Sequence, residues 1–225
     1  MNELTQNIFS DQNKNLNFVL KKSSNSISKI LFKSLNGIEI SEDEGTSLFK
    51  AKNKDDVNAI YLTAKHLCRL VNKDKVTFVV NRNINFTNVC HMGCKFCNFA
   101  KRMKDKTSEW LDLHEIVYRS QEAWDRGASE VCIQGGLHPK MDGEYYFDIV
   151  KAIKSKLPDM HIHAFSPFEI WYGSSKTRMS YKSFLSELRK MGLGSIPGTA
   201  AEILDTEIRK KLTKNKLSTE KWVEI

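Results

Sequence analysis

The chain has 225 residues, enough for one sizeable domain or for one domain with a short appendage. No apolar run approaches the length of a membrane span and the polar N-terminus lacks the layout of a secretory signal, so we expect a soluble, cytoplasmic protein without a membrane partner. The net charge of +8 comes mostly from lysine, but its denser stretches, 101–106 and 209–216, lack interleaved aromatics and are expected to be solvated, which disfavours a nucleic-acid partner.

The first quarter of the chain is expected to precede the main domain. Residues 1–25 are rich in Asn, Lys and Ser and are expected to be loosely ordered. Residues 26–75 repeat apolar side chains at three- and four-residue spacing, which predicts a helical leader. The run 76–86 is rich in β-branched and aromatic residues and predicts a strand that leads directly into a cysteine-bearing loop.

Helices and strands are predicted to alternate in the rest of residues 76–225. The expected helices cover residues 111–127, 143–158, 181–194 and 201–212, and the expected strands cover 129–136, 160–166 and 195–198. This alternation predicts an α/β fold with a partial parallel (β/α) barrel. The barrel is expected to be truncated after about four βα units, because the chain stops inside what reads as another helix; such a chain would be a fragment or would need a partner to cover its open edge.

Polar segments follow each predicted strand, and three of the four contain glycine: CHMGCKFC, QGGLHP, SPFE and PGTAAE. In a parallel barrel these segments lie at the carboxyl ends of the strands, where barrels place their chemistry. Four strand ends are therefore expected to meet at one site.

Cys90, Cys94 and Cys97 form the most informative stretch, with C-x3-C-x2-C spacing on one loop. Three cysteines on a 4Fe–4S cluster leave one iron without a protein ligand, and an open position is what a catalytic metal needs. A zinc site would need a fourth ligand, for which only the adjacent His91 is near. Cys68, on a helix, and Cys132, in a strand, are expected to be core residues.

Several segments around this loop resemble one enzyme family. NRNINFTNVCHMGCKFCNFA, EVCIQGGLHP, MHIHAFSPFEI and GLGSIPGTAAEIL are similar to the radical S-adenosylmethionine (SAM) 4-hydroxyphenyl transferases of FO synthesis, over residues 76–225. The aminofutalosine synthase and dehypoxanthine futalosine cyclase of menaquinone synthesis share some of these segments and remain the alternative. The Thr199-Ala200-Ala201 segment favours the FO branch.

The resemblance implies a 4Fe–4S cluster on the three cysteines, with SAM as the second cofactor. It implies that a SAM-derived radical cleaves L-tyrosine and that the 4-hydroxybenzyl group is added to 5-amino-6-(D-ribitylamino)uracil, a step in deazaflavin coenzyme (F-420) biosynthesis. A ring-closing radical SAM subunit or fused domain is the implied partner. The alternative from another class is a metal-binding module without catalysis.

The resemblance also implies further site residues near the strand ends. Phe96 is expected beside the adenine of SAM, or else in the core. Gln134, Gly135 and Gly136 are expected to present backbone to the SAM amino group, or else to form a tight turn. Glu202 is expected to hold a ribose hydroxyl or an amino group, or else to form a capping box with Thr199.

Histidines and polar residues near the predicted third strand leave their roles open. His161 and His163 share one strand face and are expected to point into the barrel, either as functional groups or as a hydrogen-bonded core pair. Ser166 and Glu169 follow that strand, and His138 follows the strand before it. Each is a candidate site residue.

Overall fold

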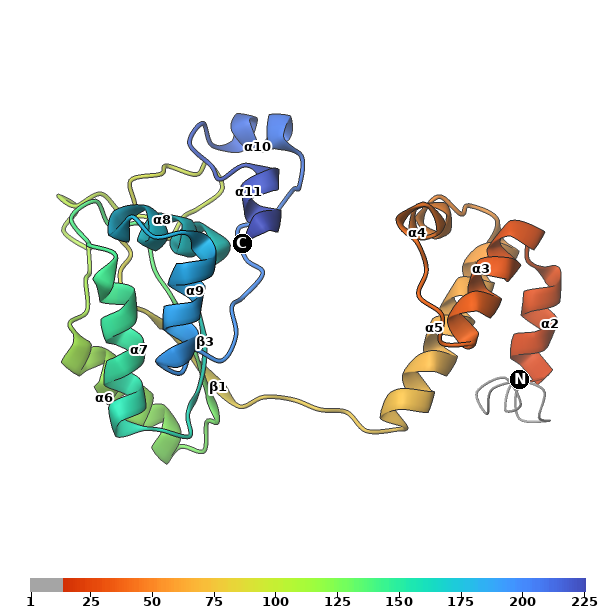
Figure 1. The fold of residues 1–225 in the computed structure, drawn as a ribbon, viewed down its shortest axis with the longest axis horizontal. Helices are drawn as coiled ribbons and strands as arrows, with labels where there is room; N and C mark the ends of the chain where they lie inside the picture. Colours follow the sequence, from red (N-terminus) through yellow and green to blue (C-terminus); the bar gives the residue numbers. More distant parts are fainter. Residues whose placement is uncertain (1–13) are drawn as a thin grey trace. The chain divides into compact units, whose positions relative to one another are not determined.

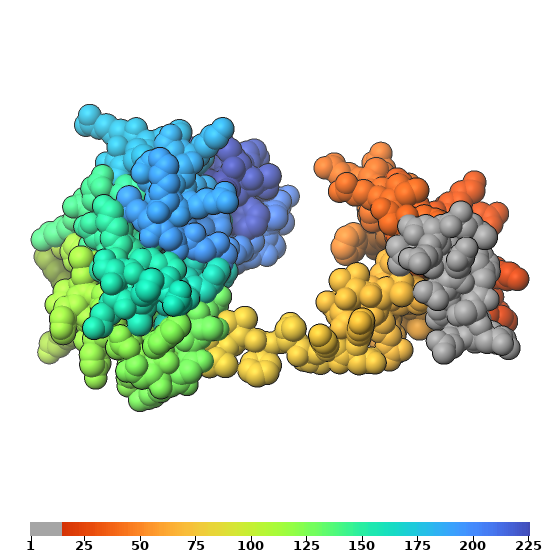
Figure 2. All heavy atoms as spheres, turned by 60° about the horizontal axis from the view of Figure 1, so that its bottom comes forward, coloured from red at the N-terminus to blue at the C-terminus, as the bar shows by residue number. Residues whose placement is uncertain are grey.

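The computed structural model describes residues 14–225, and the chain divides into two compact units, Met1–Thr77 and Phe78–Ile225. The division lies two residues from the boundary expected between 75 and 76. Figure 2 draws the heavy atoms of both units as spheres, coloured along the sequence. Residues 1–13, part of the segment expected to be loosely ordered, lie outside the described residues.

The first unit consists of helices around a small apolar core. They are α2 (Lys14–Lys22), α3 (Asn25–Leu35), α4 (Glu42–Phe49) and α5 (Lys54–Asn72). Leu20 of α2, Leu35 of α3 and Ala59 of α5 are among the buried side chains that join them. The expectation of loose order up to residue 25 was therefore wrong for α2, whose apolar side chains complete this core.

The second unit is built on a parallel sheet of three strands within the described residues: β1 (Asn81–Asn85), β2 (Glu130–Gln134) and β3 (His161–Ala164), in that order. Both pairs of neighbours are parallel, so the predicted sheet of βα units is confirmed. The fourth predicted strand, 195–198, reduces to a single bridge between Ser195 and His163. Pro197 has no N–H and cannot continue the ladder.

The first predicted strand is shorter than its sequence suggested. β1 begins at Asn81, and residues 76–80 pair with no strand, although Ser129 N–H donates to the Val80 carbonyl oxygen. Val76 and Phe78 are 91% and 83% exposed. The β-branched residues 76–80 predicted a strand here, but β2 begins at Glu130, which is paired with Asn81. Residues 76–80 therefore have no strand residues opposite them.

Helices α6 (Leu113–Asp125) and α7 (Glu144–Lys156) connect the strands, as Figure 1 shows. The helices that follow β3 are α8 (Pro167–Thr177), α9 (Tyr181–Lys190), α10 (Thr206–Leu212) and α11 (Thr219–Glu224). Helix α8 was not predicted. The helix predicted over 201–212 begins only at Thr206, and the residues before it form a loop. No helix among residues 14–225 is long and apolar enough to cross a membrane.

The two faces of the sheet differ in chemistry. The face packed into the main core carries apolar side chains: Ile84, Val131, Ile133, Ile162 and Ala164. The alternate positions, which point to the other face, carry asparagines on β1, Glu130, Cys132 and Gln134 on β2, and His161 and His163 on β3. The polar face and the strand ends are therefore where ligands can be bound.

Candidate functional site

A pocket of about 240 Å³ lies at the carboxyl ends of the strands. The loops after β1, β2 and β3 and the loops on either side of α10 contribute to its walls. Its lining includes Cys90, Cys94, Cys97, Phe96, Gln134, Gly135, Ser166, Glu169, Thr199 and Glu202. Residues from four expected strand ends are thus brought together.

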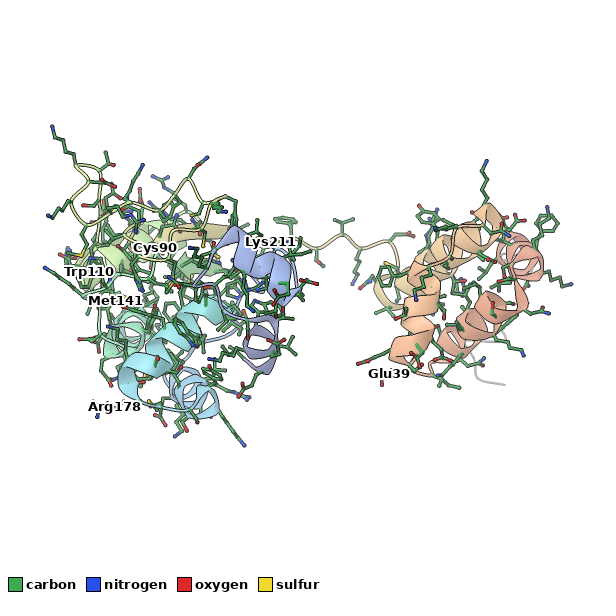
Figure 3. The ribbon with its side chains drawn as sticks, turned by 90° about the horizontal axis from the view of Figure 1, so that it is seen from above. Glu39, Cys90, Trp110, Met141, Arg178 and Lys211 are labelled. Atoms are coloured by element: carbon green, nitrogen blue, oxygen red, sulfur yellow. The ribbon has the colours of Figure 1, made fainter. Side chains whose placement is uncertain are left out.

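The loop that follows β1 carries the three cysteines and is held by backbone hydrogen bonds. Cys90 N–H donates to the Lys101 carbonyl oxygen at 3.1 Å, and Lys95 N–H donates to the Leu212 carbonyl oxygen of α10 at 3.3 Å. Gly93 has φ of +69°, a backbone conformation that favours glycine. Figure 3 labels Cys90 of this loop and Lys211 of α10, both in the second unit.

The three thiols fit an iron–sulfur cluster better than a single ion. All are free, and they line one pocket. A tetrahedral zinc ion would need a fourth ligand, and the adjacent His91 does not line the pocket. Burial raises the pKa of the Cys90 thiol, and the nearby Cys94 and Cys97 raise it further. A cationic group bound among them would relieve this repulsion.

Gly136, the second of two glycines after β2, lets the cysteine loop approach the sheet. A Cβ at Gly136 would lie 2.3 Å from the Val89 carbonyl oxygen and 2.9 Å from the Cys90 Cβ, which is closer than atoms can pack. Gly136 N–H donates to the Thr87 carbonyl oxygen at 2.8 Å, and Gly135 N–H donates to Glu169 Oε1 at 2.9 Å. Both amide N–H groups are therefore used within the protein.

Glu169 is a buried carboxylate that links two strand ends. It lies in the first turn of α8, where Ser166 is the N-cap and the two form a capping box. Its Oε2 accepts from the Ser166 N–H and hydroxyl, both at 2.7 Å. Burial raises the pKa of Glu169 to about 7, although the hydrogen bonds from Ser166 and Gly135 act in the opposite direction.

Glu202 is paired with a lysine that the sequence did not single out. Lys216 Nζ lies 2.7 Å from Glu202 Oε2 and 4.9 Å from the centre of the Phe96 ring, and its side chain is only 2% exposed. The capping box suggested for Thr199 and Glu202 is wrong, because α10 begins later and its N-cap is Asp205. Phe96 itself is half-exposed, not a core residue.

Arg209 holds the loop that carries Glu202. Its guanidinium donates to the carbonyl oxygens of Ala200, Ala201, Ile203 and Leu217 at 2.7–3.0 Å. The residue is 1% exposed. The expectation that residues 209–216 are solvated was therefore wrong for Arg209 and for the side chain of Lys216.

Several predicted positions lie outside the pocket. His91 is not among its lining residues, and its Nδ1 is 2.6 Å from the Leu137 carbonyl oxygen. His138 is buried against Trp110, with ring centres 4.2 Å apart, and desolvation lowers its pKa. Cys68 is exposed and Cys132 half-buried, so neither is the core residue that was expected. His161 and His163 do not line the pocket either.

The sequence analysis did not identify Lys216 as a site residue. Lys216 lies in a lysine-rich segment, and the local sequence does not show that its side chain is buried between Glu202 and Phe96. The link from Glu169 to Gly135 was also missed, although Ser-Pro-Phe-Glu at 166–169 has the spacing of a capping box with proline at its first position.

The pattern of the Radical SAM superfamily matches residues 84–225. The chain belongs to this superfamily, whose members use a 4Fe–4S cluster and S-adenosylmethionine.

Two curated relatives show which members of the superfamily the chain is similar to. The chain is 46% identical to "FO synthase" of Streptomyces coelicolor over 187 residues, which is 83% of this chain and 22% of that protein. It is 41% identical to the "5-amino-6-(D-ribitylamino)uracil--L-tyrosine 4-hydroxyphenyl transferase" of Methanothermobacter thermautotrophicus over 197 residues, 88% of this chain and 53% of the relative. The chain thus spans about half, or less, of the curated relatives it matches.

Solved structures share the fold. HydG, a maturase of the FeFe-hydrogenase, aligns over 96% of this chain and 46% of its own with a TM-score of 0.66 and 14% identity. This structural similarity supports the assignment of the parallel sheet to a radical SAM fold.

Proposed function

We propose that this chain forms the cluster-binding part of a transferase that cleaves L-tyrosine and adds its 4-hydroxybenzyl group to 5-amino-6-(D-ribitylamino)uracil. The observation that carries the proposal is the convergence of the three cysteines with Gln134, Gly135 and Glu202 in one pocket. The named relatives supply the substrate class. They do not favour the futalosine enzymes.

We assign Cys90, Cys94 and Cys97 as the ligands of the cluster, which together with SAM would supply the radical that starts the reaction. Phe96 offers an aromatic surface beside the cysteines. Its contact with the Lys216 ammonium group holds that surface over the pocket.

The loops opposite the cysteines would orient SAM. Gln134 and Gly135 contribute to the wall at the end of β2, and Gly136 keeps that wall against the cysteine loop. Glu202 can accept hydrogen bonds from ribose hydroxyls, since Lys216 contacts only its Oε2. We also propose that the protein is located in the cytoplasm and that a ring-closing subunit or fused domain is its partner.

The experiment is anaerobic turnover of the chain reconstituted with iron and sulfide, supplied with dithionite, SAM, tyrosine and the ribitylaminouracil. We expect 5′-deoxyadenosine together with the hydroxybenzyl adduct of the pyrimidine by mass spectrometry. A parallel reaction uses a version of the chain extended to the length of its curated relatives. If the extended protein forms 5′-deoxyadenosine without the adduct, the substrate assignment is wrong. If it forms neither product, the proposed enzymatic activity is wrong.

A further inference from the structure

A second set of ligand-type side chains lies on the polar face of the sheet, outside the cysteine pocket. Glu130 is the first residue of β2 and is paired in register with His161, the first residue of β3. His163 follows on the same face. One carboxylate oxygen and one nitrogen of each imidazole all lie within 4.8 Å of one another. β2 runs about 13 Å from Glu130 to Gln134, which lines the cysteine pocket.

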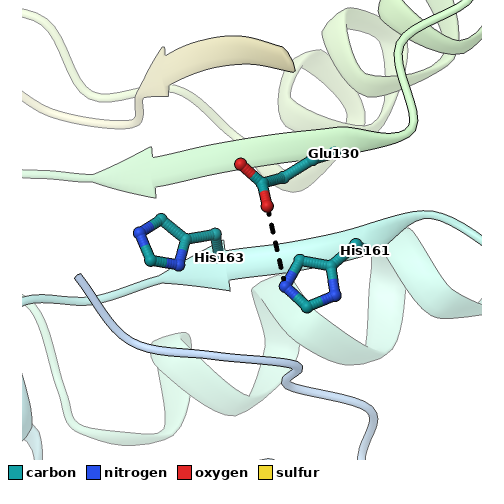
Figure 4. A group of neighbouring side chains, drawn as sticks. All are labelled: Glu130, His161 and His163. Atoms are coloured by element: carbon teal, nitrogen blue, oxygen red, sulfur yellow. Dashed lines mark ion pairs between the residues drawn. The ribbon is translucent and has the colours of Figure 1, made fainter. Parts of the chain in front are cut away.

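The two imidazoles converge on one point. His161 Nε2 lies 2.9 Å from Ser195 Oγ, and His163 Nδ1 lies 2.7 Å from the same oxygen. Glu130 Oε2 is 3.7 Å from His161 Nε2, and Figure 4 shows this carboxylate facing the ring across the two strands. Both rings hydrogen-bond to the Ser195 hydroxyl, so these two nitrogens and Glu130 Oε2 face one small volume in which a cation can be bound.

Neighbouring residues hold these ligands in place. A Cβ at Gly194 would lie 2.3 Å from the His161 ring, so this ring position requires glycine there. Asn81 Nδ2 donates to Glu130 Oε1 at 3.2 Å, which leaves Oε2 directed toward His161. Hydrogen bonds to the second oxygen of a ligating carboxylate are typical of metal sites.

We propose that Glu130, His161 and His163 bind a divalent transition metal ion such as Zn²⁺. Two imidazole nitrogens and one carboxylate oxygen match the ligand preference of zinc, cobalt and nickel, and they leave a fourth position for the Ser195 hydroxyl or for water. The Glu130 carboxylate offsets part of the positive charge of the ion. The His161 side chain is 44% exposed, so an ion can enter. The proposal does not depend on the proposed transferase activity.

The test uses the full chain with Cys90, Cys94 and Cys97 replaced by serine, so that the three thiols of the pocket do not compete; Cys68 and Cys132 are retained. Titration with Zn²⁺ by calorimetry and with Co²⁺ by visible absorption should give one saturable equivalent. His161→Ala, His163→Ala and Glu130→Gln should each weaken binding by more than about tenfold, and Asn81→Ala by about tenfold. His114→Ala, which removes an exposed imidazole on α6, is the matched control and should bind as the parent does.

Circular dichroism shows whether each variant is folded. If the serine background unfolds, the cobalt spectra of the chain with its cysteines and of its His161→Ala variant are compared instead. The imidazole–carboxylate site predicts a loss of ligand-field absorption without loss of thiolate charge-transfer bands. Absence of one-equivalent binding in folded protein, or equal binding by the parent and the His161→Ala and His163→Ala variants, would overturn the site.

Discussion

Gly136 is the residue that sets the distance between the sheet and the cysteine loop. Because its Cβ would overlap the Val89 carbonyl oxygen, Gly136→Ala must push the loop away, at an overpacking cost of about 1–3 kcal/mol. We predict that this variant keeps its secondary structure but loses most of its iron after anaerobic reconstitution. Gly198→Ala is the control, since the nearest atom to its Cβ would be 4.0 Å away. Full iron content in Gly136→Ala would contradict this role.

Arg209 stabilises the loop of Glu202 through three backbone carbonyl oxygens and ties it to a fourth, that of Leu217. Lysine cannot reproduce the guanidinium fork, so Arg209→Lys would leave buried carbonyl groups without donors. We expect the free energy of unfolding in urea to fall by about 3 kcal/mol. Arg126→Lys, at a 75% exposed side chain paired with Glu122, should change it by less than about 0.5 kcal/mol. Equal effects of the two substitutions would refute the assignment.

The sequence identifies some site residues and conceals others. The spacing of the three cysteines is a local signal, and the structure places all three in one pocket. Lys216 and Arg209 look like members of a solvated basic run. Their burial depends on contacts with Glu202 and with loop carbonyl groups, and nothing in the local sequence predicts such contacts.

At the scale of elements, α8 is a helix that the sequence analysis did not predict. Ser166 and Glu169 were predicted as candidate site residues in a polar segment after the third strand, but serine, proline and glutamate there also have the positions of a helix start. The capping glutamate also accepts the Gly135 N–H, so the start of α8 is joined to the end of β2. This second contact joins two loops of the pocket and depends on the tertiary structure.

The capping box of α8 predicts a pH dependence of stability. The pKa of Glu169 is about 7 when folded, above its ordinary value of 4.5. Between these values the folded chain binds more protons than the unfolded chain, so stability should fall as pH rises from 4.5 to 7 and then level off. The loss amounts to about 3 kcal/mol.

Urea unfolding at several pH values tests this dependence. Glu169→Gln should flatten the profile between pH 4.5 and 7, because the substituted side chain does not titrate. Glu187→Gln, at a partly exposed helix position beside Lys190, is the control and should leave the slope unchanged. The same slope in Glu169→Gln as in the parent would show that another group is responsible.

At the scale of the whole molecule, the order of strands and helices was predictable but the extent of the sheet was not. Alternating apolar patterns predicted βα units, and β1, β2 and β3 confirm a parallel sheet. The pattern could not show that residues 76–80 and 196–198 lack strand partners, since pairing depends on where neighbouring strands begin and on the missing N–H of Pro197.

The central claim is that three cysteines at the strand ends hold a cluster with one iron open to SAM. Anaerobic reconstitution followed by electron paramagnetic resonance of the reduced protein tests it most directly. We predict about four irons per chain, a spectrum that changes when SAM is added, and loss of the signal in Cys90→Ser, Cys94→Ser and Cys97→Ser but not in Cys68→Ser. A cluster signal that persists in the three variants, or a spectrum indifferent to SAM in the parent, would contradict the account.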